Sequence, residues 1–301
     1  EPIVPTRTSI SAATTPTQRP PATPYPTVTT PSPAPTVTLT PTQPSSMAAK
    51  LWQGKPRWGI GLASSGSIAR YDISGLNLGW YLDWHAQAIP DRPGGIDYAQ
   101  MVRFKGGVLQ PNAEAITRVA ASNPGSLWLI SNEPDVKWQD NVEPATYAEL
   151  YQQAYGAIKA GDPSAQVAIG GVTQPTPLRL RYLEEMLQAY EKKFGKKPPL
   201  DAWHVHNFIL REERDSWGVD IPPGIDDVQG RLYEIDDNDD IAIFRQQIVD
   251  FRQWMAAHGY QDKPLIVSEY GVPMPEDYGF PPERVTAFLS ATFDYFLMAQ
   301  D

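Results

Sequence analysis

Two glutamates stand directly after apolar runs that have the character of β-strands. Glu133 follows residues 127–131 (LWLIS) within Ser-Asn-Glu-Pro-Asp, and Glu269 follows residues 264–268 (PLIVS). An isolated carboxylate is unfavourable to bury, so each one needs a partner or a function. Cleavage of a glycosidic bond uses such a pair, because one carboxyl protonates the leaving oxygen while the other attacks the sugar carbon or activates water. We therefore expect both glutamates to be catalytic; the alternative is two ordinary strand-end carboxylates in salt bridges.

A second group of reactive side chains is the pair His204 and His206 in the run WHVHNF. The two histidines are two positions apart in a predicted strand, so they share one face. If that face is interior, His206 can hydrogen-bond a sugar hydroxyl or the carboxylate of Glu269. His204 is a candidate for substrate binding, with a buried structural histidine as the alternative. Paired histidines can also bind zinc, but only with further ligands. With four histidines in the chain, we expect no metal and no other cofactor.

Aromatic side chains near the ends of predicted strands are candidates for contacts with sugar rings. Trp84 ends the apolar run at residues 77–84, Trp138 follows the turn that contains Glu133, and Tyr270 directly follows Glu269. Binding pockets are commonly lined by aromatic rings, and the flat C–H faces of a sugar pack well against them. The alternative is that these rings belong to the core.

These motifs resemble a known group of enzymes. Asn-Glu-Pro after one predicted strand, with a glutamate after another some 136 residues later, is similar to the retaining (β/α)8 glycosidases of clan A. The phrases WLISNEPD and LIVSEYG are most similar to family 128 (endo-β-1,3-glucanases) and to families 39 and 5. The similarity extends over residues 57–300.

The resemblance implies a role for each matching residue. Glu133 would be the general acid/base, Asn132 would bind the sugar 2-hydroxyl, and Glu269 would be the nucleophile. The implied activity is that of a retaining β-glycosidase on a neutral poly- or oligosaccharide, with a β-glucan favoured. The alternatives are a non-catalytic carbohydrate-binding barrel and a metal-dependent hydrolase.

Short apolar runs alternate with amphipathic helical periods from residue 57 onward. The predicted strands are residues 57–63, 77–84, 98–104, 127–131, 166–170, 202–208 and 264–268. The predicted helices are residues 146–159, 178–194, 241–258 and 282–299. Such alternation is typical of an α/β fold with a parallel sheet, and the (β/α)8 TIM barrel fits best. A doubly wound open sheet is the alternative, although no Gly-rich turn follows the first strand.

The number of predicted strands is one short of a complete barrel. Seven strands are found, and the last predicted helix runs to the end of the chain at Asp301. We therefore expect residues 47–301 to form a catalytic barrel that lacks its eighth strand. An open seam should then lie between the first and seventh predicted strands. The alternative is a first strand earlier than residue 57.

The composition bounds the remaining possibilities. Residues 1–46 are mostly Pro, Thr, Ser and Ala, which predicts a disordered linker and favours a secreted or cell-surface protein of bacterial type. The 25 basic and 35 acidic residues give a net charge of −10, which argues against a nucleic-acid partner. No apolar run reaches the roughly 18–20 residues of a transmembrane helix. We expect a monomer whose partner is a carbohydrate, with the long acidic segment 211–240 shaping its cleft.

Overall fold

The computed structural model describes residues 54–63 and 66–299. The chain divides into two units, Glu1–Thr40 and Pro41–Asp301, and the fold reported below belongs to the second. The Pro/Thr-rich segment 1–46 lies outside the described residues, so its role as a linker stays a prediction.

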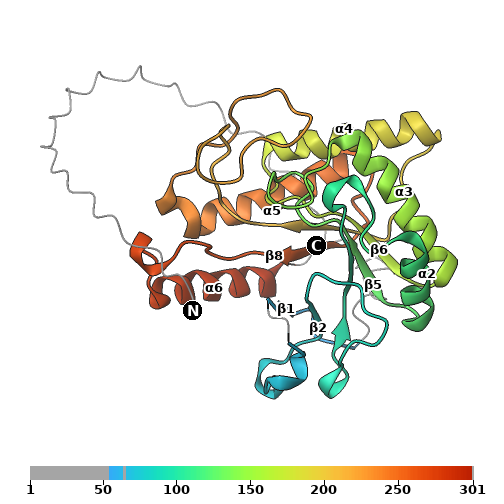
Figure 1. The fold of residues 1–301 in the computed structure, drawn as a ribbon. Helices are drawn as coiled ribbons and strands as arrows, with labels where there is room; N and C mark the ends of the chain where they lie inside the picture. The colour runs from blue at the N-terminus through green and yellow to red at the C-terminus, as the bar shows by residue number, and fades with distance from the viewer. Residues whose placement is uncertain (1–53, 64–65, 300–301) are drawn as a thin grey trace, which may run out of the picture. The chain divides into compact units, whose positions relative to one another are not determined.

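The strands are parallel and form two sheets (Figure 1). The last strand of the first sheet is followed almost directly in the chain by the first strand of the second. The first sheet has the order β1 (Gly59–Gly61), β2 (Trp80–Leu82) and β3 (Asp97–Tyr98). The second has the order β4 (Gln100–Val102), β5 (Leu127–Ile130), β6 (Gln166–Gly170), β7 (Ala202–His206) and β8 (Leu265–Glu269). Only Ala99 separates β3 from β4, so these two strands together correspond to one predicted strand, residues 98–104. The seven predicted strands are confirmed.

The helices lie between the later strands, close to their predicted positions. They are α2 (Ala113–Ser122), α3 (Pro144–Gly161), α4 (Pro177–Phe194), α5 (Ile241–Ala257) and α6 (Pro282–Met298). Short 3-10 turns are η1 (Ile68–Arg70), η2 (Ser74–Leu76), η3 (Pro93–Gly95), η4 (Lys105–Gly107), η5 (Ile235–Asp239) and η6 (Glu276–Tyr278). Proline occupies the first turn of α3, α4 and α6, where its missing N–H is no loss. The acidic residues before α5 end at Asp240, which caps this helix. Its side chain accepts hydrogen bonds from the amides of Ala242 and Ile243.

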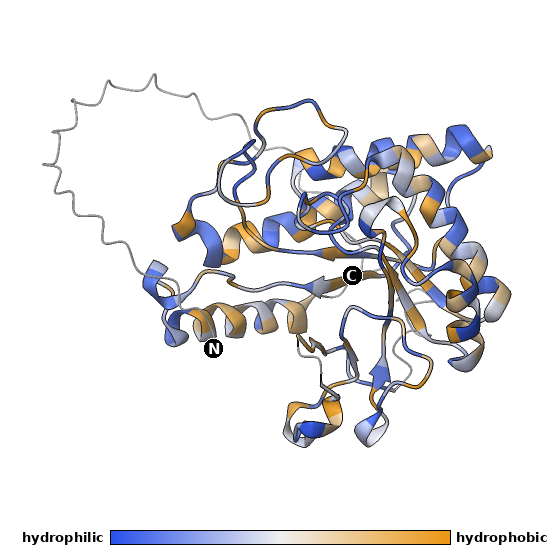
Figure 2. Ribbon diagram, in the orientation of Figure 1, coloured by the Kyte–Doolittle hydropathy of each residue, from blue (hydrophilic) through white to orange (hydrophobic). Residues whose placement is uncertain are grey.

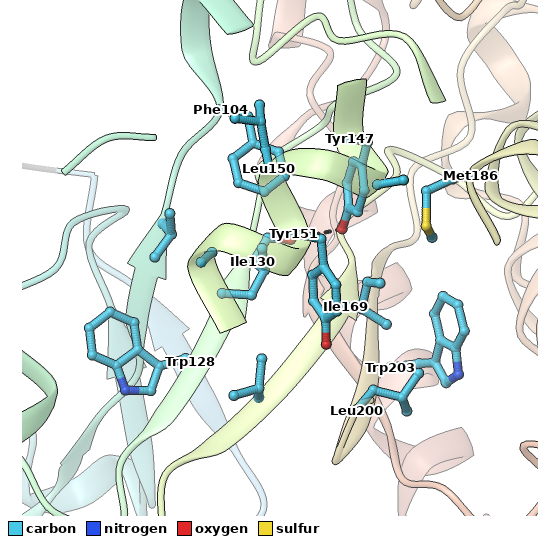
Figure 3. Close-up of a cluster of buried hydrophobic side chains, with 14 of the residues drawn as sticks. Phe104, Trp128, Ile130, Tyr147, Leu150, Tyr151, Ile169, Met186, Leu200 and Trp203 are labelled. Carbon is cyan, nitrogen blue, oxygen red and sulfur yellow. Dashed lines mark hydrogen bonds between the residues drawn. The ribbon is translucent and has the colours of Figure 1, made fainter. Parts of the chain in front are cut away.

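The larger hydrophobic cluster lies between the second sheet and the helices α2 to α5 that cover it. It includes Trp128 of β5, Trp203 of β7, Tyr147 of α3 and Met186 of α4, all fully buried (Figure 3). Figure 2 shows the same strands as predominantly hydrophobic. This layer fixes the outer face of the sheet.

The alternate side chains of the strands meet on the inner face. Leu82 of β2, Met101 of β4, Leu129 of β5 and Ile266 of β8 belong to one buried cluster. Since β2 and β8 lie in different sheets, the two sheets must curve toward each other for these residues to pack together. The fold is therefore TIM-barrel-like, and the predicted α/β class is confirmed.

The strands β1 and β8 border an open seam. No hydrogen-bonded pairing joins them in the described part of the chain, although some of their residues lie near each other. Every residue of β1 is exposed, and α6, which packs beside β8, exposes Phe293, Leu297 and Met298. This arrangement agrees with the predicted seam between the first and seventh predicted strands.

The helices α2 and α3 pack closely because α3 has a glycine where they meet. A Cβ atom at Gly161 would lie 2.2 Å from the backbone oxygen of Thr117 and 2.9 Å from the Cβ of Ala120. Neither neighbour is the end of a flexible side chain, so a larger residue would push the helices apart.

We predict that Gly161→Ala lowers the free energy of unfolding by about 1–3 kcal/mol, because overpacking strains the backbone of both helices. Urea unfolding at constant pH measures this change. The matched control is Gly156→Ala in the same helix, where a Cβ would meet nothing within 4 Å. The control should be neutral or stabilising by up to about 1 kcal/mol, as alanine favours helix. Equal effects of the two substitutions would contradict the close approach.

Candidate active site

The turn after β5 places Glu133 with an unusual backbone conformation. Ser131 has φ = 69° and Glu133 has φ = 47°, both in the left-handed region that residues other than glycine avoid. The amide of Glu133 donates to the carbonyl of Gly171, the residue after β6, at 2.8 Å. Such conformations cost roughly 1–3 kcal/mol each and gather at functional sites.

A buried carboxylate holds this turn in place. Asp140 accepts hydrogen bonds from the amides of Phe104 and Asn132, at 2.7 and 2.9 Å, and from the hydroxyl of Ser131 at 2.9 Å. It also pairs with Arg103 at 2.7 Å. These contacts join the ends of β4 and β5 and so set the direction in which Asn132 and Glu133 leave the sheet.

A register shift between β7 and β8 aims Glu269 inward. Val205 pairs with Val267, but the next residue of β7, His206, pairs with Glu269 rather than with Ser268. Irregularities of this kind redirect side chains next to active sites. As a result, Glu269 lies on the same side as His206.

His206 lies between the two glutamates. Its Nδ1 is 3.1 Å from Oε1 of Glu133 with hydrogen-bond geometry, and its Nε2 is 3.2 Å from Oε1 of Glu269. The second contact is within ion-pair distance but is not aligned as a hydrogen bond. One imidazole ring thus spans the gap between the two carboxylates. The sequence analysis expected a hydrogen bond from His206 to Glu269; in the structure the hydrogen bond is to Glu133, and Glu269 lies at ion-pair distance.

The charges around His206 favour its protonated form. Burial by itself would lower the pKa of this histidine. The negative charge of Glu269 and the hydrogen bond to Glu133 outweigh burial, so its pKa is raised above the usual 6.5. A protonated imidazole carries an N–H on each ring nitrogen, and the one on Nδ1 is aligned with Glu133.

Trp84 contacts the second glutamate directly. Its indole Nε1 donates to Oε1 of Glu269 at 2.5 Å. Trp84 has φ = 63°, a strained value for a bulky residue. A Cβ at Gly61 of β1 would lie only 3.1 Å from the indole ring, so glycine there makes room for it. The side chain predicted to contact sugar therefore orients a candidate catalytic carboxylate.

Asn132 and Trp138 differ in exposure. Asn132 is 3% exposed, and its Oδ1 has no hydrogen-bond partner among the described residues. An unpaired buried acceptor is unfavourable and calls for a donor such as a hydroxyl. Trp138 is 71% exposed, with the amine of Lys137 5.0 Å from its ring centre. An exposed indole is the form that stacking on a sugar requires.

The structure places two other predicted contact residues away from the carboxylates. Both ring nitrogens of His204 have protein partners, the hydroxyl of Ser268 at 3.3 Å and the carbonyl of Ile130 at 3.1 Å. Burial lowers the pKa of His204 to about 3, so it is neutral and structural, which is the alternative stated for it. The ring of Tyr270 packs against Phe244 in the cluster beside α6 rather than in the site.

Asp140, which holds the turn of Glu133, is a residue that sequence reasoning missed. It lies in the polar turn WQDN and contacts a backbone amide 36 residues away, so no local spacing marks it. Within residues 54–63 and 66–299, no group of three or more acidic, histidine or cysteine side chains is placed to bind a metal ion. Likewise, no helix of this part is long and apolar enough to cross a bilayer.

Comparisons with known proteins place this geometry in context. The family model described as the glycosyl hydrolase catalytic core matches residues 59–216, slightly more than half of the chain. This range includes Glu133 and ends before Glu269. A search of curated proteins finds no match.

The solved structures that match this chain include the following three. A glucosidase from Croceicoccus marinus has a TM-score of 0.54 and 13% identity, over 80% of this chain and 57% of that chain. A GH128 (subgroup II) endo-β-1,3-glucanase from Sorangium cellulosum has a TM-score of 0.49 and 20% identity, over 78% and 81%. A GH128 (subgroup III) curdlan-specific exo-β-1,3-glucanase from Blastomyces gilchristii has a TM-score of 0.49 and 18% identity, over 80% and 84%.

We predict that His206→Gln destabilises the fold in a pH-dependent way. A pKa raised on folding contributes stability that is fully present below the unfolded value, about 6.5, and that is lost as pH rises through the folded value. The difference from wild type should be about 1.5–3 kcal/mol near pH 6, typical of hydrogen bonds to charged groups, and should shrink toward pH 9. Urea unfolding of both proteins across this range measures it. A difference that grows with pH would contradict the bridging role.

Proposed function

Because the chain belongs to the glycosyl hydrolase catalytic core family, it is a glycosidase, and we propose that it cleaves a β-glucan by a retaining mechanism at Glu133 and Glu269. The observation that carries the proposal is the single imidazole of His206 in contact with both carboxylates. It supports a site in which two glutamates from opposite strands flank one glycosidic bond.

The proposed reaction has two steps. The carboxylate of Glu269 attacks the anomeric carbon and forms a covalent glycosyl-enzyme, while Glu133 donates its proton to the leaving oxygen. Glu133, now ionised, then removes a proton from water as the water attacks the same carbon and releases Glu269. The sugar keeps its anomeric configuration because it is inverted twice.

The surrounding residues suit these roles. Trp84 donates to Oε1 of Glu269, which directs the other carboxylate oxygen toward the substrate. The unpaired Oδ1 of Asn132 can accept a hydrogen bond from a hydroxyl of the sugar that Glu269 attacks. His206 lies between the carboxylates and keeps both directed at the same bond.

The substrate is proposed from charge and from the sequence resemblance to family 128. A net charge of −10 disfavours an anionic polysaccharide, so a neutral glucan fits better. The exposed Trp138, close in sequence to Glu133, offers a platform for further sugar units of a chain. We also propose that the protein acts as a monomer outside the cell, with the Pro/Thr-rich residues 1–46 as a spacer.

We predict that Glu269→Ala abolishes turnover and that azide partly restores it, giving a glycosyl azide of inverted configuration. The reason is that azide fills the space left by the nucleophile and attacks from the same side. Product analysis by NMR measures the configuration. Glu276→Ala, which removes an exposed carboxylate on η6, is the control and should keep wild-type rates. A fully active Glu269→Ala would refute the proposed mechanism.

A screen against β-1,3-, β-1,4- and mixed-linkage glucans, mannan and xylan tests the substrate. We predict release of reducing ends from a β-1,3-containing glucan, with the first product in the β configuration. Early product anomers, followed by NMR before mutarotation, distinguish retention from inversion. Initial α products would contradict retention, and exclusive cleavage of mannan or xylan would contradict the glucan preference.

A further inference from the structure

Three charged side chains form a fully buried network behind the turn that contains Glu133. Arg179 of α4, Asp135 and Glu212 all have side chains without solvent exposure. The Nε of Arg179 donates to Asp135 at 2.6 Å, and its Nη1 donates to Glu212. Removing one member would leave a buried charge without its partner.

The first end of the network is the turn itself. Asp135 lies two residues after Glu133 and also accepts the amide of Thr173, at 3.2 Å, beyond the end of β6. Burial raises the pKa of Asp135, the charge of Arg179 lowers it, and the charge of Glu133 raises it again. Asp135 and Glu133 are therefore electrostatically coupled as well as neighbours in the chain.

The second end is the long segment 209–234, which follows β7. Glu212 exchanges backbone hydrogen bonds with Gly230 and Arg231, each 2.8 Å, and its carboxylate accepts the amide of Arg231 at 2.6 Å. The Nη2 of Arg179 donates to the carbonyls of Val219 and Asp220, both at 3.2 Å. Arg179 thus contacts this segment at two separate places.

Stability alone does not account for such a network. Apolar residues of similar volume commonly stabilise a fold as well as a buried ion pair does. A planar guanidinium with fixed donor directions, in contrast, specifies the relative position of the groups it binds. Here those groups are the turn with Glu133 and the segment beside it.

We propose that Arg179 is a positioning residue that fixes the Glu133 turn against segment 209–234, so that proton donation to the leaving group depends on Arg179. This inference rests on the proposed role of Glu133 as the acid. It also assigns the segment to the leaving-group side of the site, since Glu133 protonates that group. Lys137, in the same turn, supports this placement, because its amine lies 3.6 Å from Asp215 and 3.7 Å from Asp220.

The test compares leaving groups of different quality. General acid catalysis contributes roughly 10²–10⁴-fold, and only poor leaving groups need it. We expect Arg179→Lys, which loses the planar fork, to slow kcat/KM on an unactivated β-glucan oligosaccharide by at least about 10-fold. On a dinitrophenyl β-glucoside the loss should be under about 3-fold, since that group leaves without protonation.

A matched control exists on the same helix. Arg181 pairs with Asp227 of the same segment, but at the surface. Arg181→Lys should change neither rate by more than about 2-fold, as exposed ion pairs contribute little. If Arg181→Lys slowed cleavage of the unactivated oligosaccharide as selectively as Arg179→Lys, the specific role of Arg179 would be overturned.

A neutral variant tests the inference if Arg179→Lys does not fold. The triple variant Asp135→Asn, Arg179→Met and Glu212→Gln removes all three charges and leaves none unpaired. It should show the same selective loss on the poor leaving group. An equal loss on both substrates, or none, overturns the inference when Glu133→Ala does show leaving-group dependence. If Glu133→Ala shows no such dependence, the proposed function fails first and this inference falls with it.

Discussion

The contact of one buried imidazole with two carboxylates is the constraint on which the rest of the site depends. Glu133 and Glu269 leave strands that are not neighbours in the sheet, and their like charges repel. His206 lies between them, so the C-terminal ends of β5, β7 and β8 must lie level with one another along the sheet. The register shift at His206 and Glu269 and the left-handed backbone at Glu133 both serve this placement. The two hydrophobic layers of the sheet then hold the strands in the required order.

Much of this arrangement could be predicted from the sequence because it follows from local patterns. Short apolar runs gave the strands, and carboxylates directly after two of them pointed to a shared edge, where the ends of parallel strands meet. Spacing by two along a strand placed His204 and His206 on one face, as observed. Their different roles could not be predicted, because they depend on what lies opposite each ring: a carbonyl for His204 and two carboxylates for His206.

Other parts of the site have weaker signals. Arg179 lies on the buried face of α4 together with Tyr182, Leu183 and Met186, three, four and seven positions later. A charged residue within an apolar stripe needs a buried partner. The pattern of α4 therefore indicates that Arg179 has such a partner, but it does not identify which residue that is. The partners come from turns 33 and 44 residues away. The register shift has no sequence signature, because it arises only when the two strands pair.

The left-handed backbone at Trp84, Ser131 and Glu133 connects the thermal stability of the protein with the arrangement of its candidate catalytic residues. Each of these residues adopts a conformation that its own side chain disfavours, and the surrounding contacts maintain it. Glycine would relieve the backbone strain there, but it would remove the hydrogen bonds of Trp84 to Glu269 and of Ser131 to Asp140. The same changes would delete or loosen the side chains around the carboxylates. Evolution toward a hotter environment would have to stabilise this protein elsewhere, for example at the exposed Gly156 of α3.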